Sequence, residues 1–96
     1  MEIPGVIRIG PIDFTVTVID RLVDSDGGKK LDGHIKYSEC EIEIDGKLSG
    51  QAAKQVVWHE ALHGLVVMLG QEMEESKIDA LAYGIMQVLR DNEYLR

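Results

Sequence analysis

His59-Glu60-Ala61-Leu62-His63 is the stretch of sequence that decides how the rest of the chain is organised. It lies within residues 51–69, which contain no proline and whose apolar residues recur at helical spacing. Residues four apart on an α-helix are neighbours on one face, so both imidazoles can reach the same metal ion. Glu60 would then lie beside that ion, where it can take a proton from a water molecule. The stretch therefore predicts a helix that carries a zinc (Zn2+) site.

The residues around the motif define the ends and the burial of this helix. Ser49 is of a type that caps helix N-termini, and Gly70 is of a type that ends helices. Two apolar stripes along residues 51–69 predict a largely buried helix. A lone histidine on such a face is usually a core residue with a satisfied hydrogen bond. Two histidines that flank a glutamate at this spacing favour metal binding instead.

Length and composition limit the class of protein. The 96 residues are expected to form one domain, residues 1–96, with residues 1–48 mainly β and residues 49–96 mainly α. A net charge of −7 argues against nucleic acid or an anionic membrane as the main partner. No apolar run approaches the ~18 residues of a membrane span, and the N-terminus lacks the features of a signal peptide. With one cysteine, Cys40, the chain is expected in a reducing cytoplasm.

Four short segments before the motif have the composition of β-strands. They are Val6–Ile9, Phe14–Ile19, Gly33–Tyr37 and Glu39–Ile44, and Cys40 is expected to be a small residue of the last strand. Residues 24–30 form a polar, glycine-rich loop that lacks the calcium-binding pattern of an EF-hand. A second helical pattern runs over residues 73–90. The expected fold is α+β: a small antiparallel or mixed sheet of three to four strands, followed by the motif helix and a second packing helix.

Two histidines do not complete a catalytic zinc site, which usually has three protein ligands and leaves a fourth position for water. The third ligand is expected in or just before the second helix, where the carboxylates are Glu72, Glu74, Glu75 and Asp79. At about 100° per residue, Glu74 and Glu75 flank the apolar stripe of this helix, whereas Glu72 points away. Glu75 is the predicted ligand and Glu74 the alternative. Asp79, one turn after Glu75, can accept a hydrogen bond from a ligand histidine and orient its ring.

The motif and its downstream residues resemble a known group of enzymes. His59-Glu60-x-x-His63, followed by Glu75-x-x-Ile78-Asp79-x-Leu81-Ala82, is similar to the gluzincin pattern, and most similar to the ImmA/IrrE-type metallopeptidases of phages and mobile elements. The resemblance covers roughly residues 33–92. It implies zinc bound by His59, His63 and Glu75, with Glu60 as the general base and a peptide bond in a regulatory protein as the substrate. The chain departs from the pattern in its short connection, because eleven residues separate His63 from Glu75.

Several points stay open at this level. Fuller gluzincins stabilise the oxyanion with a histidine or tyrosine, and His34, Tyr37 and Tyr83 are equal candidates here. An edge strand, for which we consider the one ending at Ile44, can hold an extended peptide or protein substrate by strand addition. The chain can act as a monomer or as a homodimer. Two other classes of protein fit the sequence. One is a non-catalytic phage or mobile-element regulator whose small core is stabilised by a bound metal. The other is a metal-free scaffold in which the two histidines are core residues.

Overall fold

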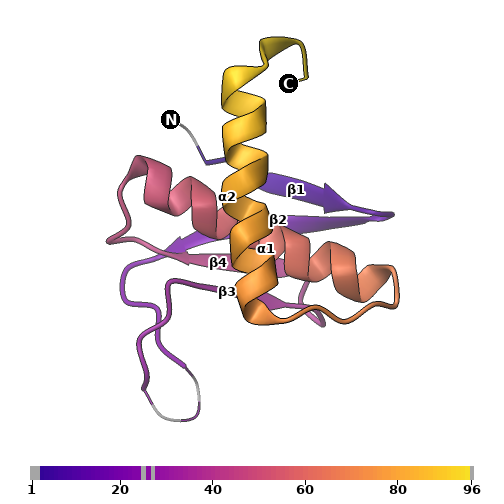
Figure 1. Ribbon diagram of the computed structural model, residues 1–96. Helices are drawn as coiled ribbons and strands as arrows, with labels where there is room; N and C mark the ends of the chain where they lie inside the picture. Colours follow the sequence, from indigo (N-terminus) through magenta and orange to yellow (C-terminus); the bar gives the residue numbers. More distant parts are fainter. Residues whose placement is uncertain (1–2, 25, 27, 96) are drawn as a thin grey trace.

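Four strands precede two helices in the computed structural model, which describes residues 3–24, 26 and 28–95 (Figure 1). The strands are β1 (Val6–Ile9), β2 (Ile12–Ile19), β3 (Gly33–Lys36) and β4 (Glu41–Asp45). The helices are α1 (Gly50–Met68), α2 (Glu75–Asp91) and a short 3-10 helix, η1 (Glu93–Leu95). The predicted α+β fold, with a sheet followed by the motif helix and a second helix, is confirmed.

The sheet is mixed, with the strand order β1-β2-β4-β3. β1 and β2 form an antiparallel hairpin, β2 and β4 run parallel, and β3 is antiparallel to β4. The edge strands are therefore β1 and β3, and the expectation that the strand ending at Ile44 lies at an edge is wrong. The burial explains this: Ile42 and Ile44 are 0% and 1% exposed, because β4 is flanked by strands on both sides and covered by α1.

The molecule has three layers, with α1 in the middle (Figure 1). One side of α1 packs on the sheet through β1, β3 and β4, and α2 crosses the other side of α1. Within the described residues α2 contacts α1 and η1 but no strand. The second half of α2 projects past α1 toward the C-terminus. This arrangement leaves α1 as the only link between the sheet and α2.

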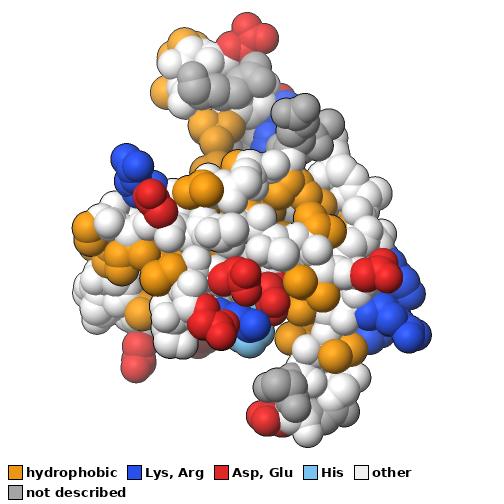
Figure 2. Space-filling model, turned by 180° about the vertical axis from the view of Figure 1, so that it is seen from behind, with side chains coloured by type: hydrophobic (Ala, Val, Ile, Leu, Met, Phe, Trp, Pro, Cys, Tyr) orange, Lys and Arg blue, Asp and Glu red, His pale blue; other side chains and the backbone are white. Residues whose placement is uncertain are grey.

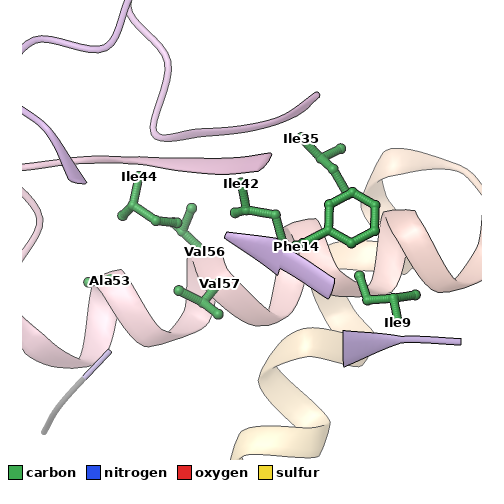
Figure 3. Packing of buried hydrophobic residues seen from close by; sticks show 8 residues of the cluster. All are labelled: Ile9, Phe14, Ile35, Ile42, Ile44, Ala53, Val56 and Val57. Carbon is green, nitrogen blue, oxygen red and sulfur yellow. The ribbon is translucent and has the colours of Figure 1, made fainter. Parts of the chain in front are cut away.

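The main core lies between the sheet and α1 (Figure 3). Its buried members are Ile9, Phe14, Ile35, Ile42, Ile44, Ala53, Val56 and Val57. Gly64 of α1 permits the close approach, because a Cβ built there would lie 2.9 Å from Cδ1 of Ile9 and 3.0 Å from Cδ1 of Ile35. A larger residue at position 64 would push the helix away from the sheet. The core thus fixes how α1 lies across the strands.

Both ends of α1 match the sequence signals. Ser49 occupies the N-cap position with extended backbone angles, although its side chain makes no capping hydrogen bond. Gly70 has a φ of +70°, and the N–H groups of Gly70 and Gln71 donate to the carbonyls of Val67 and Val66, both at 3.0 Å. This pair of bonds is a Schellman motif, which needs a left-handed residue after the helix. The predicted burial is wrong at the end of the helix. Leu69 is 64% exposed there, because it lies beyond the part of α1 that packs against the rest of the protein.

Cys40 is not a strand residue, contrary to expectation. It lies in the turn between β3 and β4 with a φ of 53°, and its N–H donates to the carbonyl of Tyr37 at 3.3 Å. β4 therefore begins at Glu41 rather than Glu39. The turn has to reverse the chain over four residues, and a left-handed conformation is one way to do so.

The face of the sheet opposite α1 is polar. Its strands alternate, so that Glu41 and Glu43 point away from the core that holds Ile42 and Ile44. Lys36 lies 3.4 Å from Glu43, 3.9 Å from Glu41 and 3.4 Å from Glu39. Figure 2 shows this side of the molecule, on which acidic side chains gather around a basic one. No described helix is long and apolar enough to cross a membrane.

Candidate metal centre

Three side chains from two helices converge at the crossing of α1 and α2. His59 and His63 lie one turn apart on α1, and Glu75 is the first residue of α2. Nε2 of His59 lies 2.6 Å from Oε1 of Glu75, and Nε2 of His63 lies 2.8 Å from Oε2 of the same carboxylate. The two Nε2 atoms are 3.1 Å apart. These residues form a group that can hold a metal ion.

The start of α2 falls between Glu74 and Glu75, and the two side chains therefore lie in different surroundings. Glu74 is the N-cap residue of α2 and is exposed, and it lines a separate surface hollow with Glu72, Met73 and Lys77. Glu75, one residue later, is turned toward the two histidines. The structure therefore places the predicted ligand in the group and leaves Glu74 outside it.

Asp79 lies behind His59, one turn along α2 from Glu75. Nδ1 of His59 is 3.1 Å from Oδ1 of Asp79, as the spacing of the acidic residues predicts. The same oxygen accepts a hydrogen bond of 2.7 Å from Nε2 of Gln55, which lies one turn before His59 on α1 and is buried. The sequence analysis missed Gln55. Its position four residues before the first histidine was the available signal, because it puts Gln55 on the same helix face.

The hydrogen bonds at His59 determine which of its nitrogens faces the group. Asp79 can accept a hydrogen bond from Nδ1 of His59, and in a neutral imidazole with its proton on Nδ1 the lone pair lies on Nε2, the atom that would bind a metal ion. That lone pair points toward Nε2 of His63 and toward the carboxylate of Glu75, which is also an acceptor. Several acceptors at such short separations require a cation between them, either protons or a metal ion. This convergence is the observation that points to a metal.

The charges in the group shift the acidities of its members. Burial alone would raise the pKa of Glu75, but hydrogen bonds from His63 and His59 outweigh it, and the pKa is lowered. Burial alone would lower the pKa of His59, but its bonds to Glu75 and Asp79 outweigh it, and the pKa is raised. The imidazole of His59 and the carboxylate of Glu75 therefore stabilise one another in their charged forms.

The donor set fits a zinc ion in chemistry and in spacing. Two imidazoles and one carboxylate are the protein ligands of a common class of catalytic zinc site. Ligands at ~2.0–2.1 Å from a tetrahedral zinc ion stand ~3.3 Å apart. The separations of 2.6, 2.8 and 3.1 Å, of which the first two go to different oxygens of the Glu75 carboxylate, would have to widen by about 0.2–0.7 Å. Other imidazole-binding metals fit the same donors.

Glu60 completes the motif on the side of α1 that faces β3. Its side chain is 8% exposed, and a Cβ built at Gly33 would lie 3.2 Å from Cγ and 3.3 Å from Oε2 of Glu60, and would clash with Val56. Only glycine at position 33 lets β3 approach so closely, a role the sequence did not reveal. Burial raises the pKa of Glu60, and the nearby charges of His59 and His63 oppose that rise. The side chain of Glu60 is therefore closely packed between α1 and β3, beside the candidate metal ligands.

A cleft of about 220 Å³ joins Glu60 to the metal donors. It lies between the start of β3 and the two helices, and it is lined by Asp32, Gly33, Gln55, Val56, His59, Glu60, Glu75 and Asp79. Glu60 and two of the three candidate ligands, His59 and Glu75, thus open onto one space, an arrangement that water activation would require.

The three candidates for oxyanion stabilisation differ in their distance from this cleft. Tyr83 is 59% exposed on α2, two turns after Glu75. His34 is exposed on β3 and pairs with Glu43, so its Cβ lies on the polar face of the sheet. Tyr37 follows β3, and burial and then the charge of Glu60 raise its pKa. Glu60 therefore interacts electrostatically with Tyr37 and also with His34, whose charge lowers the pKa of Glu60.

Comparison of the chain with protein-family models, with curated proteins and with solved structures finds no match.

Proposed function

We propose that this chain is a zinc-dependent peptidase that hydrolyses a peptide bond in a protein substrate. One observation carries the proposal: His59, His63 and Glu75 converge on one point, and buried Glu60 opens onto the same cleft. His59 and His63, with Glu75, would hold the ion. Asp79 and Gln55 would hold the ring of His59 in the orientation that metal binding needs.

The roles of the side chains follow from their positions. A zinc ion at such a site makes water more acidic and polarises the carbonyl of the scissile bond. Glu60 takes a proton from the attacking water and later gives it to the leaving amine. Its burial favours this role, because a raised pKa brings a carboxylate closer to the pH at which it must both accept and release a proton. Tyr37 is the side chain we expect to stabilise the oxyanion.

The free edge of β3 is the expected place for the substrate backbone. Among the described strands β3 pairs with β4 alone, so its outer edge offers N–H and C=O groups that an extended peptide can meet by strand addition. Gly33 brings this edge close to Glu60. A peptide on β3 would therefore pass beside the base and the metal donors.

The resemblance to ImmA/IrrE-type gluzincins supports a narrower form of the proposal. It suggests a regulatory protein as the substrate, a phage or mobile element as the setting, and the cytoplasm as the compartment. The placement of Glu75 agrees with the ligand role that this resemblance implies for it.

The test compares the zinc-loaded wild-type chain with Glu60→Gln. We expect wild type to cleave a mixed peptide library and Glu60→Gln to lose at least a hundredfold in rate while it keeps its zinc, because removing a general base costs roughly 10²–10⁴-fold. Mass spectrometry of the peptides and elemental analysis of the protein give the two readouts. Glu72→Gln, a change at an exposed glutamate outside the cleft, is the matched control. Full activity in Glu60→Gln would contradict the mechanism.

A second candidate function is a non-catalytic regulator in which the metal holds α2 against α1. The observation in its favour is the small apolar contact between these helices, which among the described residues buries Leu62, Ile78 and Ala82 and half-buries Trp58, Val66 and Ile85. Such a protein would bind zinc without an exchangeable water. Cobalt substitution separates the two candidates, because the cobalt spectrum distinguishes a site with an open water position from a closed one.

A further inference from the structure

The cleft beside the metal donors has a strong charge of one sign. Four of its lining residues are acidic: Asp32, Glu60, Glu75 and Asp79. Among the described residues that line it, none is lysine or arginine. Cleft walls of low dielectric concentrate the field of such charges and raise the local concentration of ligands of opposite charge.

A divalent cation at the site would offset Glu60 and Glu75 and leave the other two carboxylates. Asp79 already accepts hydrogen bonds from Gln55 and is paired with His59. The carboxylate of Asp32, by contrast, has no hydrogen bond or ion pair with any residue in the described part of the chain. Its backbone is fixed, because its carbonyl accepts a 2.9 Å hydrogen bond from the N–H of Asp45. Asp32 is therefore a positioned and unpaired charge at the mouth of the cleft.

On the basis of the proposed peptidase function, we propose that Asp32 makes this cleft select peptides with a lysine or arginine close to the scissile bond. An unpaired carboxylate at the start of the strand that binds the peptide is placed to pair with a basic side chain. The same charge repels an acidic side chain at that position, so peptides with aspartate or glutamate there would bind more weakly.

The relative direction of α1 and β3 indicates on which side of the scissile bond Asp32 would contact the peptide. Position 33 lies against Val56 and Glu60, and Ile35 lies against Gly64, so α1 and β3 run in the same direction. The metal donors at positions 59 and 63 therefore lie beyond Asp32 along β3. A peptide that adds antiparallel to β3 has its C-terminal part toward Asp32. The selected basic residue should follow the scissile bond.

The experiment measures binding to zinc-loaded Glu60→Gln, so that no cleavage disturbs the titration. Fluorescein-labelled peptides of one sequence, with lysine, glutamine or glutamate at each position in turn, are titrated by fluorescence anisotropy. We expect lysine to bind best and glutamate worst at one or two neighbouring positions. Adding Asp32→Asn should reduce the lysine preference roughly two- to fivefold, the range for a partly exposed ion pair. The preference should also shrink as salt is raised.

The matched control is Asp13→Asn in the same background. Asp13 is also an exposed aspartate, but it lies on the β1–β2 hairpin at the far side of the sheet, where it pairs with Arg8. The control removes the same charge, so a general effect of net charge would reduce the lysine preference equally in both variants and would overturn the proposal. Equal binding of the three peptides at every position would also overturn it.

Cleavage by the wild-type chain separates this inference from the function on which it rests. Charge-selective binding with no cleavage of any peptide would retain the selectivity of Asp32 and contradict the peptidase. Cleavage without charge selectivity, unchanged by Asp32→Asn, would retain the peptidase and contradict the role of Asp32.

Discussion

The two faces of α1 are held in different ways. Toward the sheet, α1 shares an apolar core of eight buried residues, and Gly64 lets the backbone approach the strands. Toward α2, the apolar contact among the described residues is smaller: Leu62, Ile78 and Ala82 are buried, with Trp58, Val66 and Ile85 half-buried against them. The polar groups of the candidate metal centre lie beside this contact. The first interface, between α1 and the sheet, is hydrophobic. The second interface, between α1 and α2, also contains the candidate metal centre.

The difference predicts which part of the fold would respond to a bound metal ion. Apolar burial stabilises the sheet and α1 whatever is bound. The second interface places an exposed carboxylate against two histidines, and it reaches its full strength only when a cation lies between them. α2 should therefore be the part of the molecule that responds to zinc, while the sheet should not respond.

The largest effect is expected from Ile42→Ala, which removes a fully buried side chain from the first interface. We expect a loss of about 2–5 kcal/mol in the free energy of unfolding, because the change leaves a cavity among packed neighbours. Urea unfolding followed by circular dichroism measures it. Val18→Ala, on β2 but 57% exposed, is the control and should stay within about 0.5 kcal/mol. A loss below 1 kcal/mol for Ile42→Ala would mean that this interface is not the main core.

Zinc should stabilise the second interface. At a free zinc concentration of 100 times Kd we expect a gain of about 2.7 kcal/mol, since the ion binds the folded chain only. Hydrogen exchange should show that added protection falls on α2 and on the part of α1 that faces it, and much less on β2 and β4. A chelator should reverse the effect. Equal protection throughout the sheet would contradict the separation of the two interfaces.

The sequence predicted the local features well because they depend on residues close together in the chain. The helix with His59 and His63 follows from four-residue spacing, and the pairing of Asp79 with His59 follows from the turn after Glu75. The Schellman motif at Gly70 likewise needs only the preceding turn.

What the sequence did not reveal depends on contacts between distant segments. The parallel pairing of β2 with β4 joins segments more than twenty residues apart, and it places β3 rather than β4 at the edge of the sheet. The role of Gly33 appears only when β3 lies against Glu60, and that of Gln55 only when Asp79 comes within 2.7 Å. In each case a residue type common in many settings acquires its role from a partner more than twenty residues away.

A smaller effect is expected from Asp79→Asn, which keeps the shape of the side chain and removes its charge. An asparagine accepts a weaker hydrogen bond from His59 and also brings a donor, so it holds the ring less well in the metal-binding tautomer. We expect zinc affinity to fall roughly ten- to a hundredfold, which corresponds to about 1.4–2.7 kcal/mol. Competition with a chromophoric chelator measures it. Unchanged affinity would show that Asp79 does not orient the histidine.

The smallest effect is expected from Glu74→Gln, and its contrast with Glu75→Gln tests the boundary of the site. The two glutamates are neighbours, but Glu74 is the N-cap residue and faces away from the histidines, while Glu75 lies within 2.8 Å of both. Elemental analysis should find about one zinc per chain in wild type and Glu74→Gln, and much less in Glu75→Gln and His63→Ala. Glu74→Gln should also change stability by less than about 0.5 kcal/mol, as expected for an exposed residue. Zinc lost from Glu74→Gln and kept in Glu75→Gln would move the third ligand by one residue and turn the start of α2 by about 100° relative to α1. The polar interface would then be rebuilt around a different carboxylate, while the apolar one would stay as it is.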